Sequence, residues 1–109
     1  MYEAVTGRLP FDGPDAVSVA TNAAAFALGT DTGDSVRKPA AYSGVVGYKP
    51  TWGLVSRYGL FPFTPSLDAL GFFTRSVYDS AAILNVVAGY DERDFTSSKE
   101  KVDDCSPHG

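Results

Sequence analysis

The chain has 109 residues, 44% of them hydrophobic, which suffices for one domain with a modest core and no more. Nine basic and 13 acidic residues give a net charge of −4, which argues against an autonomous nucleic-acid-binding protein, because such proteins present a basic surface. No apolar run approaches the roughly 20 residues of a membrane span, no secretory signal is visible, and the single cysteine, Cys105, has no disulfide partner, so we expect a cytoplasmic protein.

Turn-forming residues dominate the N-terminal stretch, and a helix is predicted directly after them. Proline and an Asp-Gly pair in residues 9–14 favour a turn. Asp15 is a suitable N-cap for a helix from Ala16 to about Ala25, in which small residues recur at helical spacing. The stretch from Phe26 to Thr30 then predicts a short strand.

A glycine-containing turn follows this strand and leads to a serine at the expected start of a second helix. The run is Gly29-Thr30-Asp31-Thr32-Gly33-Asp34-Ser35-Val36-Arg37-Lys38-Pro39-Ala40. Because proline suits only the first turn of a helix, Pro39 favours a helix from Val36 to Tyr42, ended by Gly44. Ser35 then has two interpretations. It is either an N-cap, a position where serine is favoured, or a nucleophile whose turn presents backbone N–H groups to a developing negative charge.

The middle of the chain predicts one more strand and a long loop. The strand covers Val45 to Tyr48. Residues 50–65 contain proline, glycine and aromatic residues, so we expect an irregular loop there. Its aromatic side chains are expected to pack the loop down, and they are Trp52, Tyr58, Phe61 and Phe63.

The clearest predicted helix runs from Ser76 to Ala88. Ser76 and Asp79 form a capping box at its start, and Gly89 ends it. Its apolar face is predicted to contain Val77, Ala81, Leu84 and Ala88. After Asp91 the periodicity is lost. These elements predict an α/β or α+β fold with a small mixed sheet and flanking helices.

The run from Gly29 to Ala40 resembles the nucleophile segment of the amidase signature family, whose usual form is close to G-[ST]-D-x-G-G-S-[IV]-R-x-P-A. Later stretches resemble the A-type component of the aminoacyl-tRNA amidotransferases within that family. They are Tyr42–Thr51, Gly53, Val55–Leu60, Ser66–Asp68, Gly71, Thr74-Arg75 and Asp94-Phe95-Thr96-Ser97. The resemblance covers about residues 26–98 and implies that the fold is part of the amidase-signature fold.

The resemblance implies a Lys–Ser–Ser mechanism of amide hydrolysis in which Ser35 is the nucleophile. It places the backbone N–H groups of the oxyanion hole on Thr32, Gly33, Asp34 and Ser35. Asp31 and Arg37 fall on positions that support this turn. The implied substrate is glutamine or another amide, and neither a metal nor a cofactor is implied. The implied partners are subunits of the B and C type and, through them, aminoacyl-tRNA that receives the released ammonia.

Three departures from the family pattern weaken the expectation of activity. Asp34 stands where glycine is common. Phe11 lies in the stretch where the family has a relay serine, and no lysine precedes Lys38 to act as the base. Lys38 is expected to be a solvent-exposed cation three residues after Ser35. Because members of a catalytic triad act as a unit, we expect the chain by itself to be nearly inactive, which leaves its status as an enzyme open.

Residues 2–13 have a separate resemblance, to a segment in the large lobe of serine/threonine protein kinases. They follow the pattern Tyr-Glu-x-x-x-Gly-x-x-Pro-Phe, and the catalytic motifs of kinases are missing. This predicts three parts, with residues 1–20 of kinase-like origin, residues 21–98 as a partial amidase-signature domain and residues 99–109 as a loose tail. The alternative function is a non-catalytic fragment or chimera, whose uncovered sheet edges and apolar faces would favour self-association. A kinase remnant ranks last.

Overall fold

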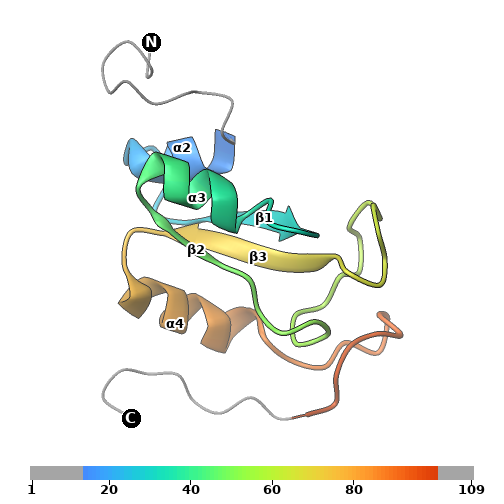
Figure 1. Cartoon of the computed structure of the whole chain (residues 1–109). Helices are drawn as coiled ribbons and strands as arrows, with labels where there is room; N and C mark the ends of the chain where they lie inside the picture. Colours follow the sequence, from blue (N-terminus) through green and yellow to red (C-terminus); the bar gives the residue numbers. More distant parts are fainter. Residues whose placement is uncertain (1–13, 101–109) are drawn as a thin grey trace.

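The computed structural model describes residues 14–100, which form an antiparallel sheet with helices on both faces (Figure 1). The elements are α2 (Pro14–Ala20), β1 (Ala27–Asp31), α3 (Arg37–Ser43), β2 (Val46–Tyr48), β3 (Ala69–Thr74) and α4 (Val77–Val87). The predicted α/β class is confirmed, although both strand pairs are antiparallel where a mixed sheet was expected. Phe11, Cys105 and the kinase-like segment lie outside the described residues. Within residues 14–100 no helix is long and apolar enough to cross a membrane.

The strand β3 is the centre of the sheet, and the sequence predicts no strand there. The strand order is β1-β3-β2, and both neighbours run antiparallel to β3, so β1 and β2 are parallel to each other and α3 connects them. Five of the six residues of β3 are buried. The run Ala-Leu-Gly-Phe-Phe-Thr therefore lacks the polar alternation that marks a half-exposed strand.

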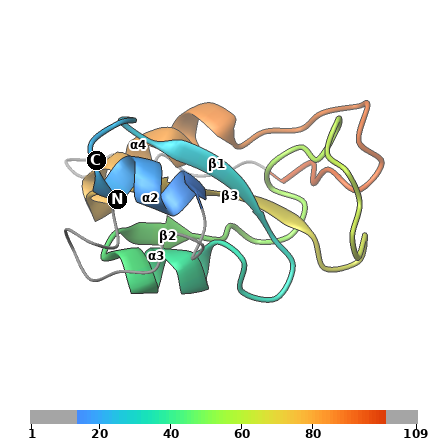
Figure 2. The same cartoon turned by 90° about the horizontal axis from the view of Figure 1, so that it is seen from above.

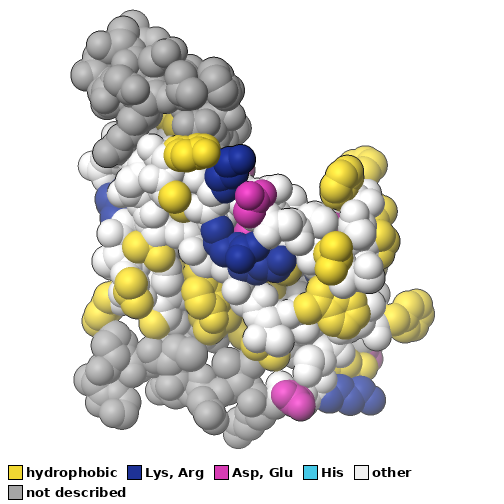
Figure 3. All heavy atoms as spheres, viewed as in Figure 1, with side chains coloured by type: hydrophobic (Ala, Val, Ile, Leu, Met, Phe, Trp, Pro, Cys, Tyr) yellow, Lys and Arg dark blue, Asp and Glu magenta, His cyan; other side chains and the backbone are white. Residues whose placement is uncertain are grey.

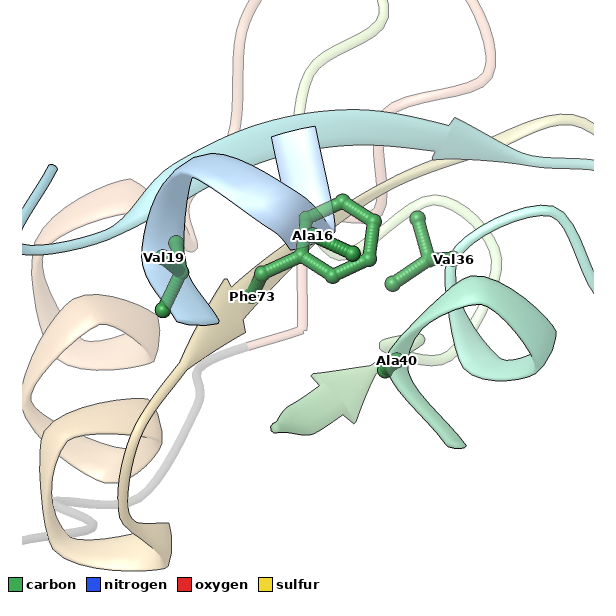
Figure 4. Packing of buried hydrophobic residues seen from close by; sticks show 5 residues of the cluster. All are labelled: Ala16, Val19, Val36, Ala40 and Phe73. Carbon is green, nitrogen blue, oxygen red and sulfur yellow. The ribbon is translucent and has the colours of Figure 1, made fainter. Parts of the chain in front are cut away.

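Two hydrophobic clusters lie on opposite faces of β3. Figure 2 shows α2 and α3 over one face of the sheet and α4 beyond the other. The first cluster consists of Ala16, Val19, Val36, Ala40 and Phe73 (Figure 4). The second consists of Val55, Phe72 and Leu84. Because successive side chains of a strand point to opposite faces, the adjacent Phe72 and Phe73 each fill one cluster.

The helix α2 is shorter than its pattern predicts, because the chain turns away after Ala20. Asn22 has a φ of 64°, a left-handed conformation that ends helices. The guanidinium of Arg75 then donates to the carbonyl oxygens of Val19 at 3.1 Å and Ala24 at 3.0 Å. A residue distant in sequence therefore holds the turn that ends α2.

The helix α3 begins at Arg37, and its N-cap residue Val36 makes no side-chain capping bond. Its end at Gly44, with a φ of 73°, agrees with the sequence. The helix packs closely on β2, because a Cβ atom at Gly47 would lie 2.5 Å from that of Ala40. The glycine in β2 therefore permits the close contact between α3 and the sheet.

The predicted capping of α4 is confirmed, but its buried face differs from the prediction. Ser76 Oγ accepts a hydrogen bond from the backbone N–H of Asp79 at 3.1 Å. Ser80 and Leu84 are the buried residues of the helix, whereas Val77 is 74% exposed. The helix ends where Gly89 N donates to Leu54 O at 3.0 Å. Pairing with the loop before β3 therefore fixes its C-terminus.

The loop between β2 and β3 is irregular, as predicted, but most of its aromatic side chains do not pack it down, although Trp52 Nε1 donates to Pro65 O at 3.3 Å. They are exposed, at 42% for Trp52, 61% for Tyr58, 97% for Phe61 and 84% for Phe63. Polar contacts hold the loop instead. The guanidinium of Arg57 donates to Asp68 O at 3.0 Å and to Thr96 Oγ1 at 2.8 Å, and it lies 4.8 Å from the centre of the Trp52 ring.

Candidate active site

A buried carboxylate fixes the turn between β1 and α3. Asp31, the last residue of β1, has no exposed surface. Its Oδ2 atom accepts hydrogen bonds from the backbone N–H groups of Val36 at 3.1 Å and Arg37 at 3.3 Å, and from Arg37 Nε at 3.2 Å. Asp31 thus satisfies the N–H groups that begin α3, a role that the sequence offered to Ser35.

Two cations flank Asp31. Arg37 forms the ion pair just described, and Lys49 Nζ lies 3.6 Å from Asp31 Oδ1. Burial raises the pKa of Asp31, but hydrogen bonds from Arg37 and the Val36 N–H outweigh it, so that the net pKa is lowered. Asp31 in turn raises the pKa of Arg37. Figure 3 shows basic and acidic side chains side by side where β1 meets α3.

Ser35 lies in the exposed part of this turn, together with Gly33 and Asp34. Within residues 14–100, no hydrogen bond engages the Ser35 hydroxyl or the backbone N–H groups of Gly33, Asp34 and Ser35. The carboxylate of Asp34 contributes to the raised pKa of Arg37. The turn therefore presents a hydroxyl and a row of N–H donors to solvent.

Thr32, at the start of the turn, contacts two residues that sequence reasoning did not assign to the site. Its hydroxyl donates to Asp68 Oδ1, and its carbonyl oxygen accepts from Lys49 Nζ at 3.2 Å. Asp68 also accepts the backbone N–H groups of Phe63 at 2.8 Å and Thr64 at 3.1 Å. The hydrogen bond from Thr32 is the main cause of the lowered pKa of Asp68. The only sequence signal for Lys49 and Asp68 was their place in the family-like stretches.

A pocket of about 170 Å³ lies on the Asp68 side of the turn. Its lining combines apolar loop side chains with charged groups, and consists of Thr30, Arg57, Leu60, Phe61, Pro62, Pro65, Asp68 and Asp94. Because Asp68 also binds Thr32, the pocket and the turn share one carboxylate.

Neither lysine near the turn is bound to Ser35. Lys38 is exposed, and its Nζ lies 5.9 Å from the centre of the Tyr42 ring. Lys49 contacts Asp31 and Thr32. In the part of the chain that the structure describes, no three His, Cys, Asp or Glu side chains are placed to hold a metal ion. Among residues 14–100, therefore, no basic side chain is hydrogen-bonded to the Ser35 hydroxyl.

Comparison with known proteins identifies the family. Residues 13–108 match the amidase family. The chain belongs to the amidase signature family. The chain is 55% identical to the A-type component of the glutamyl-tRNA(Gln) amidotransferase of Pediococcus pentosaceus over 92 residues. These 92 residues are 84% of this chain and 19% of that protein. Identity to the corresponding protein of Caldanaerobacter subterraneus is 59% over 92 residues, again 84% of this chain and 19% of that protein.

Solved amidase structures superpose on this chain. The A-type component of the Thermotoga maritima glutamyl-tRNA(Gln) amidotransferase matches with a TM-score of 0.80 and 52% identity, over 82% of this chain and 20% of that chain. The peptide amidase of Stenotrophomonas maltophilia matches with a TM-score of 0.75 and 39% identity, over 86% of this chain and 19% of that chain. The amidase-signature resemblance is thus confirmed, and the chain spans about a fifth of the length of these relatives. The kinase-like resemblance of residues 2–13 is not supported by these comparisons.

Proposed function

We propose that Ser35 is the nucleophile of an amide-cleaving site and that the N–H groups of the turn from Thr32 to Ser35 form its oxyanion hole. The observation that carries this proposal is the exposed hydroxyl beside N–H donors that no described residue engages, on a turn fixed from behind by Asp31. Donors that are already in place need no reorganisation when negative charge develops on the substrate oxygen. In this proposal Asp31 and Arg37 support the turn and do not contact the substrate.

The reaction we propose for the whole protein is glutamine hydrolysis coupled to tRNA-dependent amidation. Ser35 Oγ attacks the side-chain amide carbon of glutamine, the C–N bond breaks, and the nitrogen leaves as ammonia after taking up a proton. Water then cleaves the acyl ester to glutamate. The support is the set of relatives that are A-type components of glutamyl-tRNA(Gln) amidotransferases. The partners would be subunits of the B and C type and their aminoacyl-tRNA, in the cytoplasm.

The 109 residues alone are expected to carry out this reaction very slowly. A serine hydroxyl needs an adjacent base to attack an amide, and no described residue is hydrogen-bonded to Ser35 Oγ. Phe11 stands in the stretch expected to hold the relay serine, and no lysine precedes Lys38. The nucleophile and the oxyanion turn that we propose therefore have no proton relay among residues 14–100.

A serine-directed fluorophosphonate probe tests the proposed nucleophile. The wild-type chain, Ser35→Ala and the control Ser66→Ala, which removes another exposed serine, are incubated with the probe and mapped by peptide mass spectrometry. We expect slow labelling at Ser35 in the wild type and in Ser66→Ala, because the oxyanion turn stabilises the adduct although no described residue activates the hydroxyl. Labelling that is unchanged in Ser35→Ala would disprove the nucleophile. Ammonia release from glutamine that is rapid and depends on Ser35 would disprove the expected inactivity.

A second candidate is a non-catalytic chain that associates with itself, and the exposed apolar side chains favour it. Phe61 is 97% exposed, Phe63 84% and Phe95 fully exposed. Figure 3 shows hydrophobic side chains gathered on the side of the loop between β2 and β3. The edge strands β1 and β2 add unpaired backbone groups within residues 14–100. Light scattering and circular dichroism over a concentration series test this, and a compact monomer with cooperative unfolding would contradict it.

A further inference from the structure

The turn that carries Ser35 is held at both of its ends. At its C-terminal end Asp31 accepts the backbone N–H groups of Val36 and Arg37. At its N-terminal end Thr32 is held twice, through its carbonyl oxygen by Lys49 Nζ at 3.2 Å and through its hydroxyl by Asp68. Between these two ends lie the three residues whose N–H groups no described residue engages, Gly33, Asp34 and Ser35.

The pairing of the strands brings Asp68 and Lys49 to Thr32. Asp31 pairs with Ala69 across β1 and β3. Thr32, which follows β1, therefore lies opposite Asp68, which precedes β3. Lys49 directly follows β2, on the other side of β3. The three residues that meet at the start of the turn thus each adjoin a different strand.

Neither contact is made by a freely rotating side chain. Asp68 is buried and uses its remaining acceptor positions for the backbone N–H groups of Phe63 and Thr64. Lys49 is only 23% exposed and is paired with the fully buried Asp31. These additional partners fix both side chains, so that each holds Thr32 in one position.

We propose that Asp68 and Lys49 are positioning residues of the Ser35 site, which set the direction of the N–H groups between Thr32 and Ser35. Neither touches the reacting atoms. The inference rests on the proposed function, because a fixed row of donors is useful only if a negative charge develops in front of it. Catalytic groups must be held within about 0.5 Å of their productive geometry. Contacts that fix the position of Thr32 are therefore expected to affect the oxyanion turn.

Backbone order in the turn tests the proposal without any need for activity. The 109-residue chain is labelled with ¹⁵N, and NMR order parameters are measured for Gly33, Asp34 and Ser35. In the wild type we expect values near 0.85, typical of rigid backbone, and in Thr32→Val, which lacks the hydroxyl, values below about 0.6. Thr32→Ser keeps the hydroxyl and is expected to restore the order.

Variants of the two positioning residues complete the test. Asp68→Asn and Lys49→Met are expected to lower the order parameters of the turn, and Lys49→Arg to restore them. The matched control is Asp91→Asn, because Asp91 likewise accepts a serine hydroxyl, that of Ser56 at 2.6 Å, in another part of the fold. Wild-type order in Thr32→Val and in Lys49→Met, or equal disorder in Asp91→Asn, would overturn the proposal.

The fluorophosphonate probe separates this proposal from the proposed function. If both hold, Thr32→Val and Lys49→Met label at Ser35 on the order of tenfold more slowly than the wild type. If the wild type does not label at Ser35 but the order parameters respond as expected, the proposed function fails and the positioning role stands. If the wild type labels and neither variant changes order or rate, the positioning role fails.

Discussion

The side-chain hydroxyl oxygens of Thr74 and Ser80 lie 2.6 Å apart in the buried junction between β3 and α4. Thr74 Oγ1 also donates to the carbonyl oxygen of Ser76 at 2.8 Å. Because a hydroxyl has a single proton, the bond between the two hydroxyls is donated by Ser80. Thr74 is therefore donor and acceptor at once, whereas Ser80 depends on Thr74 as its acceptor.

This asymmetry predicts unequal costs for removing the two hydroxyls. Thr74→Val leaves the Ser80 hydroxyl and the Ser76 carbonyl without this partner and is expected to lower the free energy of unfolding by about 2 kcal/mol. Ser80→Ala removes one hydrogen bond and is expected to cost about 1 kcal/mol. Urea denaturation measures both. The double variant should cost less than the sum, since the groups are coupled. A larger loss in Ser80→Ala would contradict the assigned direction of the bond.

A second prediction distinguishes the two serines that precede helices. Ser76 caps α4 through the Asp79 N–H, so Ser76→Ala is expected to lower the free energy of unfolding by about 1 kcal/mol. Ser35 makes no capping bond to any described residue, and Ser35→Ala is expected to change stability by less than about 0.5 kcal/mol. Thermal unfolding followed by circular dichroism compares them. A loss in Ser35→Ala as large as that in Ser76→Ala would favour Ser35 as a cap.

The elements that could be predicted from sequence are those whose signals are local. The start of α4 is set by Ser76 and Asp79, and the end of α3 by Gly44, each within one turn of the element. The strand β3 could not be predicted in this way, because helices cover both of its faces and remove the polar alternation. The early end of α2 depends on Arg75, which no local pattern relates to that turn.

In the candidate site, too, local contacts could be predicted from sequence and contacts between distant residues could not. The family-like run placed Ser35, Asp31 and Arg37 within a few residues of one another. In the structure Arg37 Nε donates a hydrogen bond to Asp31 Oδ2. Asp68 and Lys49 reach the turn only through the register of β1 and β3 and the position of β2. Without β3 in the prediction, no sequence argument could bring either residue to Thr32.

A third prediction concerns the close packing of α3 on β2. A Cβ atom at Gly47 would lie 2.5 Å from Ala40 Cβ and 2.9 Å from Val36 O, so Gly47→Ala forces the helix away from the sheet. We expect a loss of about 1–3 kcal/mol in the free energy of unfolding. Gly33→Ala is the matched control, because its added Cβ atom would meet nothing within 4 Å. Denaturant midpoints of the two variants check this, and equal midpoints would show that α3 can shift without cost.

The last prediction is a loss of stability in acid that originates partly in the Ser35 turn. Asp31 and Asp68 both have a pKa below the ordinary 3.8, Asp31 because the donors around it outweigh its burial and Asp68 because of the Thr32 hydroxyl. Between each folded-state pKa and 3.8 the unfolded chain binds more protons than the folded chain, so stability falls as the pH falls through this window. Above the window the contribution of both groups is fully present.

We therefore expect the free energy of unfolding to change little between about pH 7 and pH 5 and to decline below about pH 4. Urea denaturation at a series of pH values measures the slope. In Asp31→Asn the decline should be shallower, because one carboxylate with a lowered pKa is gone. A slope in Asp31→Asn as steep as in the wild type would show that the ionised carboxylate of Asp31 does not stabilise the turn.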